Sequence, residues 1–382
     1  MSTLTRIILE SKAESKIYFQ KRCQQKIEKF EKVKRSDTKE IYCPYCKQRF
    51  RYICKGKRRR KLMTSEGEIN FMLQQVQCKN CKKIHRPLIR WLGLEPRQII
   101  TEELIDKSLE VAIHTSYKTA SRLTKSLTGG KIGSRKIRDS MLKKGEEIKK
   151  HQANEPPQEF IAFCEDSTKV KTGTTKRGDD INIVYGIMGR KLMLNQKTGE
   201  IKRQLLTGKI LSVEVGNDDK IKTQHKTKNV MSDGAGSVKK KAKYKDKNII
   251  FHRCQWHLSR MLGFALYNDG LKTKKQRVPF VSKLALIIKH SFKNYKKYYN
   301  ELIQELKERE YLKAVKYLQN AEEEFYNTKE KPIMIDGIPL LANSPIERVM
   351  REIDRRIEIG ARWSKQGAEE ITRVRLHYIY NN

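Results

Sequence analysis

The sequence predicts a multidomain α/β protein in which a metal-binding module precedes a helical unit and a larger mixed-sheet domain. Three observations predict it: two CxxC pairs within residues 41–98, a helical pattern in 99–150, and strand-like runs followed by helical segments in 158–382. At 382 residues the chain is long enough for two or three domains with their own cores. The polar stretch 151–158, with two adjacent prolines, predicts a boundary before the larger domain.

A large excess of basic residues favours a polyanionic partner. Lys and Arg total 83 against 44 Asp and Glu, a formal net charge of +39. Residues 1–150 hold 38 basic and 16 acidic residues, and residues 151–382 hold 45 and 28. Because the excess is not confined to one end, the pattern favours a nucleic-acid-binding surface spread over several domains rather than a basic tail.

Neither a membrane span nor a secretory signal is predicted. The chain has no apolar run of about 18 residues, and its first residues lack the charged start, apolar stretch and cleavage site of a signal peptide. Eight cysteines, half of them in CxxC pairs, indicate thiols kept reduced for metal binding rather than a disulfide framework. We therefore expect a cytoplasmic protein without membrane contact.

Residues 1–40 are predicted to form a basic helical lead-in. From residue 12 to residue 36 lysine is frequent and apolar residues are sparse. This composition fits a solvated charged helix, and an arm that contacts DNA is the alternative.

Four cysteines in two CxxC pairs predict a structural zinc site: Cys43, Cys46, Cys78 and Cys81. Each pair can place two thiolates on one metal, and two pairs complete a tetrahedral Zn²⁺ shell with no open position for a substrate. Strand-like runs at 49–53 and 72–78 are typical of a zinc ribbon. Two unrelated cysteine pairs are the alternative, which leaves their turn-like contexts unexplained.

Between the two pairs, segment 55–61 carries six basic residues in seven, and we expect it on a loop of the zinc module. In a chain of this charge the segment favours contact with DNA phosphates, while a merely solvated charge run is the alternative. The residues expected to make the contacts are Lys57, Arg58, Arg59 and Arg60.

Residues 99–150 predict a helical unit. Thr101 and Ser116 are expected to cap its first two helices, and a Gly-Gly pair ends the second. Two helices around a glycine turn match a helix-turn-helix, although a three-helix packing module that binds nothing has a similar pattern. The residues expected to contact DNA open the last helix: Arg135, Lys136 and Arg138.

The larger domain is predicted to contain a mixed sheet and a helical block. Strands are expected at 159–164, 181–188, 207–215, 227–232 and 248–251. Helical spacing of apolar residues from 277 to 328 predicts a block that packs on itself.

Three acidic residues of this domain are candidates for one metal site: Asp166, Asp233 and Glu347. The first two follow apolar, strand-like runs, and the third opens a helical segment. Two metals held by converging carboxylates suffice for phosphodiester cleavage. Each residue also has a simple alternative: a capping aspartate with Glu165 as its competitor, an Asp-Gly turn, and a first-turn acid favoured by the helix dipole.

Basic residues accompany two of these acids. Arg348, Arg351 and Arg355 share a helix face with Glu347 and could either hold DNA phosphates or pair with nearby acids. A lysine cluster at 239–247 follows the second aspartate and is expected to track the DNA backbone.

The order of these motifs resembles a known enzyme family. Ser232-Asp233-Gly-Ala-Gly-Ser-Val238, followed by Phe251-His-Arg-Cys254-Gln-Trp-His257, resembles the second-aspartate and C/DxxH signatures of Mutator-like DDE transposases, which have an RNase H-like fold. Asp166-Ser-Thr168 is similar to the first-aspartate motif, with Ser167 in place of a common glycine. The segment from Ser344 through Trp363 to Gly367 resembles the catalytic-glutamate helix and tail of related prokaryotic insertion-sequence transposases.

The resemblance covers roughly residues 158–376 and implies a specific activity. Asp166, Asp233 and Glu347 would bind two Mg²⁺ (or Mn²⁺) ions, cleave DNA at the ends of a mobile element and join the 3′-hydroxyl to target DNA by strand transfer. The implied partners are double-stranded terminal repeats and target DNA, bound by a homo-oligomer associated with the nucleoid. A helical insertion at about 270–335 is also implied.

The CxxH motif, Cys254 and His257, needs a separate prediction. The resemblance places it near the active site, where we expect His257 to have a structural or DNA-orienting role rather than to bind metal, and Trp256 to lie in the core. Two alternatives to a transposase remain open. One is a non-catalytic zinc-ribbon and helix-turn-helix regulator or a domesticated remnant, and the other is a nuclease that only hydrolyses DNA.

Overall fold

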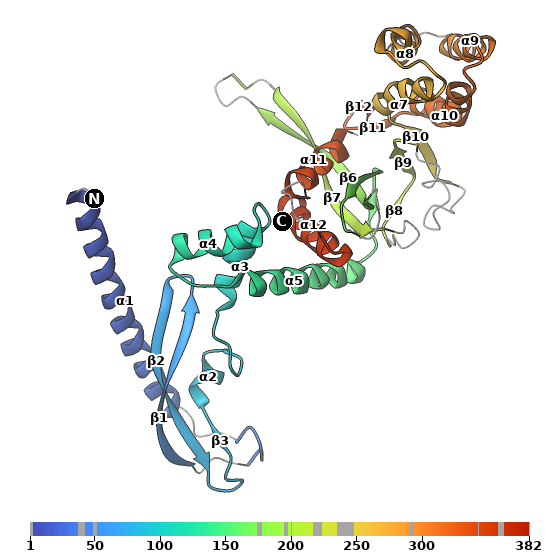
Figure 1. The fold of residues 1–382 in the computed structure, drawn as a ribbon. Helices are drawn as coiled ribbons and strands as arrows, with labels where there is room; N and C mark the ends of the chain where they lie inside the picture. The colour runs from blue at the N-terminus through green and yellow to red at the C-terminus, as the bar shows by residue number, and fades with distance from the viewer. Residues whose placement is uncertain are drawn as a thin grey trace. The chain divides into compact units, whose positions relative to one another are not determined.

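The structure is a computed structural model that describes residues 3–36, 43–48, 52–173, 178–194, 198–199, 201–216, 224–234, 248–289, 294–342, 344–357 and 363–381. The chain forms two compact units, Met1–Ser140 and Met141–Asn382 (Figure 1). Among the described residues, none of the helices combines the length and the apolar composition that crossing a bilayer requires.

The first unit opens with a helix and a hairpin. Its first elements are α1 (Thr3–Ser36), β1 (Tyr52–Thr64), β2 (Gly67–Cys78), β3 (Ile84–His85) and α2 (Pro87–Trp91). The three strands form an antiparallel sheet in the order β1-β2-β3. Ile27 and Phe30 of α1 pack against a core under the hairpin that includes Phe71 and Leu88. The lead-in is therefore helical as predicted, and its second half is a packed helix rather than a fully solvated one.

The basic segment at residues 55–61 lies on β1 and not on a loop, which corrects the expectation from sequence. Antiparallel pairing with β2 holds it extended, with a bulge between Cys54 and Lys57. Gly56 lies at this irregularity with φ of 82°, a conformation that side chains with a Cβ rarely adopt. A run of charges carries no apolar alternation, so segment 55–61 has no strand signal of its own.

Three helices complete the unit and lead out of it: α3 (Glu102–Ala112), α4 (Tyr117–Thr128) and α5 (Ser134–Asn154). The predicted caps are present, because Thr101 accepts a hydrogen bond from the backbone N–H of Leu104, and Ser116 from that of Thr119. Gly129, with φ of 70°, ends α4 in the left-handed conformation. The last helix has 21 residues, and the boundary between the two units falls within it.

The second unit is built on a mixed five-stranded sheet. Its strands are β5 (Ala162–Val170), β6 (Asp179–Leu194), β7 (Ile201–Val215), β9 (Asn229–Ser232) and β10 (Ile250–Arg253). They lie in the order β10-β9-β5-β6-β7, and each predicted strand region contributes one of them. Neighbours among β5, β6 and β7 are antiparallel, whereas β9 pairs parallel with both β5 and β10. A short parallel pair, β4 (Glu159–Phe160) and β8 (Lys226–Thr227), adjoins this sheet.

Four helices then form a block with its own core: α7 (Gln255–Asn268), α8 (Lys274–Lys289), α9 (Tyr295–Glu308) and α10 (Leu312–Glu330). Leu262, Leu284, Leu302 and Phe325, one from each helix, are fully or almost fully buried in that core. The predicted helical block is therefore present, and α7 belongs to it as well. In Figure 1 the block lies beside β10, and α10 contacts this edge strand.

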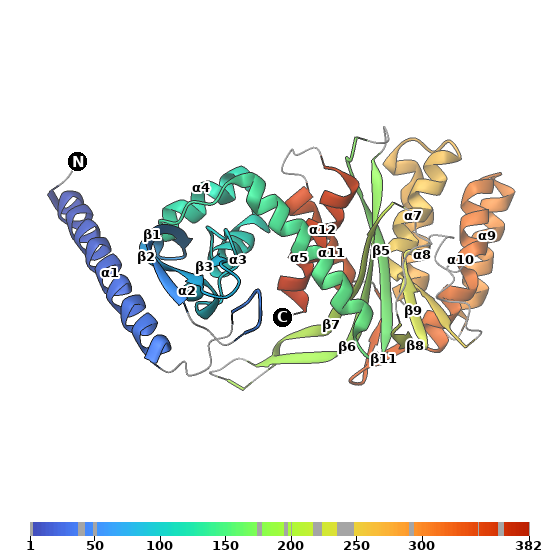
Figure 2. The same cartoon turned by 90° about the horizontal axis from the view of Figure 1, so that it is seen from below.

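The chain returns to the sheet after this block. The hairpin of β11 (Ile333–Ile335) and β12 (Ile338–Leu340) leads to α11 (Ser344–Ile357) and α12 (Lys365–Tyr380). The two helices lie against β5 and β7 respectively (Figure 2). Thr168 of β5 donates a hydrogen bond of 3.1 Å to Asp354, which ties α11 to the central strand.

Candidate metal centres

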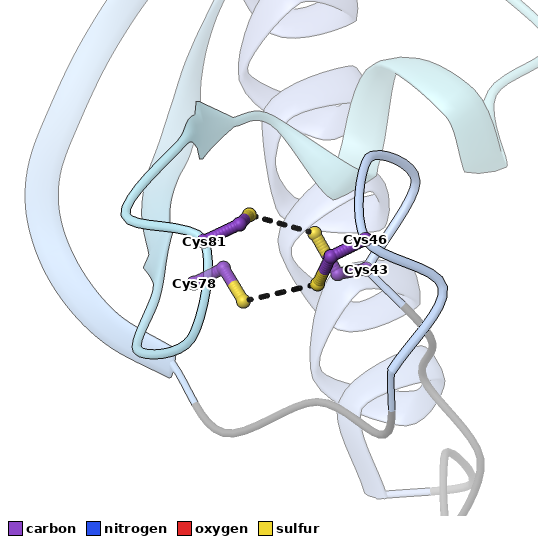
Figure 3. Close-up of side chains that lie close together, drawn as sticks. All are labelled: Cys43, Cys46, Cys78 and Cys81. Atoms are coloured by element: carbon purple, nitrogen blue, oxygen red, sulfur yellow. Dashed lines mark hydrogen bonds between the residues drawn. The ribbon is translucent and has the colours of Figure 1, made fainter.

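The four cysteines of the first unit meet at one point. Their sulfur atoms all lie within 4.8 Å of one another, with 3.6 Å between the Sγ atoms of Cys43 and Cys81 and 3.9 Å between those of Cys46 and Cys78 (Figure 3). Four thiols at these separations fit a tetrahedral Zn²⁺ ion. The structure therefore contains the cluster that the two CxxC pairs predict.

The two CxxC pairs of this cluster adopt the same turn. The backbone N–H of Lys47 donates to the carbonyl of Cys43, and that of Lys82 donates to the carbonyl of Cys78. Both lysines have positive φ, 58° and 61°. Hydrogen bonding from the backbone of Gln48 is the largest cause that lowers the pKa of the Cys46 thiol to about 6, whereas burial and the neighbouring thiols raise the pKa of Cys81 to about 11. A lowered pKa favours the thiolate, which is the form that binds metal.

The basic residues of β1 divide into two groups. Lys57, Arg58 and Arg59 are exposed. Arg60 is half-buried, and its guanidinium donates to the backbone carbonyls of Glu95 and Gln98. The first three can therefore contact a ligand, whereas Arg60 holds the chain that follows α2.

The first helical residues of α5 are also exposed. Arg135 and Lys136 face solvent, and Arg138 pairs with the neighbouring Asp139 at 2.8 Å. These side chains are therefore accessible at the start of α5.

In the second unit, Asp166, His257 and Glu347 form a compact donor group. Asp166 lies on β5, His257 in the first turns of α7 and Glu347 in the first turn of α11, and one possible ligand atom from each lies within 4.8 Å of the others. His257 Nε2 is 3.2 Å from Glu347 Oε1. The sequence placed Asp166 and Glu347 at one site and His257 near it, in a structural or DNA-orienting role rather than as a metal ligand. The structure places the imidazole among the donors.

Backbone hydrogen bonds explain how these distant segments meet. The N–H of Cys254 donates to the carbonyl of Ser232, so α7 begins where β9 ends. The next N–H, of Gln255, donates to the carbonyl of Leu341, so the chain before α11 returns to the same point. Cys254 itself is buried, and no donor group among the described residues includes it.

Asp233 lies beside this group but outside its compact core. Parallel pairing places Glu165 opposite Ser232, so the next positions in register are Asp166 and Asp233. Burial is the largest cause that raises the pKa of Asp166 to about 7, and the nearby charges of Asp233 and Glu347 contribute to this shift. The strand register and the donor group together bring three carboxylates near one another.

The competition between Glu165 and Asp166 is also resolved. Successive strand residues point to opposite faces of a sheet. Glu165 is 2% exposed and does not belong to the donor group, whereas Asp166 does.

The chemistry of this group fits a divalent cation. His257 Nδ1 is buried without a hydrogen-bond partner among the described residues, and the buried Glu347 Oε1 has His257 Nε2 3.2 Å away. Burial is the main cause that lowers the pKa of His257, which favours the neutral imidazole. Neutral imidazole and ionised carboxylates are metal ligands, and a cation would offset the repulsion around Asp166. The geometry allows His257 either to bind the ion or to orient Glu347.

A buried arginine, Arg253, fixes the turn that carries Asp233. It is 2% exposed, and its Nη1 donates to the Asp233 carbonyl at 2.6 Å. Its Nε lies 3.0 Å from an oxygen of Glu324 on α10. A Cβ on Gly234 would lie 0.7 Å from the same guanidinium, and φ there is 90°. Sequence reasoning missed Arg253, although a charged residue ending an apolar strand directly before the CxxH motif was a usable signal.

A pocket of about 420 Å³ opens beside the donor group. It is lined by Cys254, Trp256, Ala342, Ser344, Glu347 and Arg351. Trp256 is 51% exposed, so the expectation of a core position is wrong. Arg351 is exposed toward this pocket, whereas Arg355 pairs with Glu352 at 2.6 Å. Arg348 is half-buried.

Some sequence-predicted features lie outside the described residues. These are the lysine cluster at 239–247 and residues 358–362 of the arginine-rich tail.

Residues 43–125 match a family described as a domain of unknown function (DUF6431). This match includes the four cysteines, α2, α3 and most of α4, but less than half of the chain. A comparison with curated proteins finds none that matches.

Proposed function

We propose that this protein is a DNA transposase of the DDE type. The observation that carries the proposal is the convergence of Asp166, Glu347 and His257 from three separate elements on one cation-compatible site, with Asp233 adjacent. A net charge of +39 supports a polyanionic substrate.

The topology of the second unit supports an RNase H-like assignment. Three antiparallel strands are followed by two parallel ones, in the order β10-β9-β5-β6-β7, and a mixed sheet of this kind fits the proposed RNase H-like fold. The first carboxylate would lie on the central strand, the second after β9, and the third on a helix against the sheet. The helices α8 to α10 would be the insertion that precedes the third carboxylate.

In this proposal the residues have distinct tasks. Asp166, Asp233 and Glu347 would hold two Mg²⁺ or Mn²⁺ ions, which supply activation of the attacking oxygen and stabilisation of the leaving oxygen. Arg253 would keep Asp233 in place through its carbonyl. Arg351, exposed beside Glu347, would neutralise a phosphate of the scissile strand. Water would attack first, and the liberated 3′-hydroxyl would attack target DNA in the second step.

The first unit would bind the ends of the element. We propose a zinc ribbon formed around the four cysteines and a helix-turn-helix formed by α4 and α5. The exposed residues of β1 would contact phosphates, and the start of α5 would enter a groove. Assembly of two or more copies on paired DNA ends follows from the proposed family and is part of the same proposal.

Two substitutions test the proposal directly. Asp166→Asn and Glu347→Gln should each abolish Mg²⁺-dependent nicking of DNA that carries the element ends, while binding to the same DNA is retained. The matched control is Glu301→Gln, an exposed acid on α9 that should leave nicking unchanged. Full nicking by either site variant would refute the assignment.

The substrate for this assay can be found from the DNA that flanks the gene. Inverted repeats bracketing it would define the ends to be synthesised. A pre-cleaved end presented with target DNA then separates strand transfer from simple hydrolysis. Binding without any nicking in Mg²⁺ or Mn²⁺ would instead favour a non-catalytic DNA-binding protein.

A further inference from the structure

The outward face of α7 carries an exposed row of large side chains. Trp256, Phe264 and Tyr267 are 51%, 52% and 44% exposed. With Arg260 they are spaced four, four and three residues apart, so they lie on one face of the helix. At about 1.5 Å per residue, the rings of Trp256 and Phe264 are separated by roughly 12 Å along the axis. Exposed aromatic rings in such a row indicate a binding surface.

Cations lie between these rings. The guanidinium of Arg260 is 5.0 Å from the ring centre of Trp256 and 5.9 Å from that of Phe264. Lys272 and Arg277 lie 4.1 and 5.4 Å from the ring of Tyr267. The helix contains no acidic residue, and Arg260 has no ion-pair partner in the described part of the chain. The face therefore combines π-surfaces with uncompensated positive charge, which disfavours a purely apolar protein partner.

This face begins at the carboxylate site. The ring of Trp256 is 4.7 Å from that of His257, and Trp256 lines the same pocket as Glu347 and Arg351. From there the row runs along α7 toward the turn before α8. A chain bound on it would thus lead into or out of the proposed cleavage site.

We propose that this face, the α7 track (Trp256, Arg260, Phe264 and Tyr267), binds single-stranded DNA adjoining the scissile phosphate. Bases in a duplex stack on one another, whereas unpaired bases are free to stack on aromatic rings and guanidinium planes. Alternation of rings with cations provides both stacking and phosphate neutralisation. The location relative to cleavage rests on the proposed function, but the binding itself requires no catalysis.

The test uses the full-length, zinc-loaded chain with Asp166→Asn, so that cleavage cannot change the ligand. Fluorescence anisotropy would measure affinity for a labelled oligonucleotide of about twenty thymidines and for a blunt duplex. Trp256→Ala and Phe264→Ala should each weaken single-strand binding by roughly 5- to 150-fold and leave duplex binding nearly unchanged. Trp256→Phe, which keeps a ring, should retain most of the affinity.

The matched control is Tyr298→Ala, which removes an exposed ring of similar accessibility from α9. It should bind both ligands as the parent does. If Trp256→Ala fails to fold in circular-dichroism melting, Arg260→Gln and Phe264→Ala carry the test instead. The proposal is overturned if the track variants bind single strands within about twofold of the parent, or if the control weakens equally.

Failure of this proposal and of the proposed function give different results. If the parent chain, with Asp166 intact, does not nick DNA but the track variants lose single-strand binding, the α7 track is supported and the transposase is refuted. Nicking that depends on Asp166, together with unchanged single-strand binding in the track variants, would refute only the track.

Discussion

The two candidate metal centres are built in opposite ways. The cysteine centre takes all its donors from residues 43–81 and uses one turn twice, with Lys47 and Lys82 in equivalent conformations. The carboxylate centre takes donors from β5, α7 and α11 and exists only once the sheet, the helical block and the returning chain have assembled. The first centre can therefore hold its own unit together, whereas the second depends on a fold that already exists.

The largest expected effect is loss of the cysteine centre. Structural zinc contributes an apparent ~10–16 kcal/mol in small zinc modules. Cys78→Ser should therefore release the metal and unfold residues 43–85, while the second unit keeps its own unfolding transition. Elemental analysis would count zinc per chain, and hydrogen exchange would localise the unfolding.

Cys54→Ser is the matched control for this experiment. Cys54 is exposed on β1 and does not belong to the donor group, so its removal should leave zinc content unchanged. If Cys78→Ser unfolds the second unit as strongly as the first, the contrast between a local and an assembled centre is wrong.

The second effect concerns the clamp that positions Asp233. Arg253→Ala would leave Glu324 buried without its partner, and breaking a buried ion pair costs about 3–5 kcal/mol. Arg309→Ala removes the exposed pair with Glu305 in the same helical block and should cost less than about 1 kcal/mol. Chemical denaturation of the second unit would measure both. Equal losses in the two variants would mean that Arg253 has no special role.

A third prediction concerns pH in the metal-free protein. The pKa of Asp166 is raised from 3.8 to about 7, mainly by burial, so the folded state binds a proton that the unfolded state has lost. Asp166 should therefore contribute a loss of stability in the second unit as pH rises from about 4 to about 7, by a few kcal/mol at ~1.4 kcal/mol per pKa unit. Calorimetry of the transition that persists after zinc removal would measure this slope.

Two additions sharpen that measurement. Asp166→Asn should flatten the slope, because the titrating group is gone. Mg²⁺ added at pH 8 should raise the transition temperature of the parent chain and not that of the variant, since binding to the folded state stabilises it by mass action. A parent chain whose stability is flat across this range would show that Asp166 is an ordinary exposed carboxylate.

The contrast between a local and an assembled centre also explains how much of each the sequence could predict. The four cysteines are predictable because CxxC spacing alone sets the geometry of each turn. The strands and the caps at Thr101 and Ser116 are likewise local signals. The resemblance placed His257 near the active site, but its 3.2 Å contact with Glu347 was not predictable, because spacing within the CxxH turn carries no information about a helix that begins at Ser344. The exposure of Trp256 also depends on which neighbours cover α7, and no local pattern reports that.

Two further differences have the same physical origin. The basic segment 55–61 gave no strand signal, yet pairing with β2 makes it a strand. Arg253 ends an apolar run, and its burial is explained by the ion pair with Glu324 of α10. In both places a partner distant along the chain determines the local structure. Tertiary contacts routinely override local preference in this way.

The smallest effect per residue is expected on the surface of the first unit. Replacing Lys57, Arg58 and Arg59 by Gln removes exposed charges without breaking a described contact, so folding should not change. If each contacts one phosphate, the slope of log affinity against log salt should fall by about 0.9 per contact, up to about three in total. Anisotropy with duplex DNA at several salt concentrations would give the slope.

Arg60→Gln supplies the comparison within the same strand. Its guanidinium is bound to the carbonyls of Glu95 and Gln98, so this variant should lower stability while leaving the salt slope unchanged. Neither result should change when Asp166→Asn is present, because the four residues lie in the first unit and Asp166 in the second. A slope that stays unchanged in the exposed trio would mean that Lys57, Arg58 and Arg59 do not contact DNA phosphates.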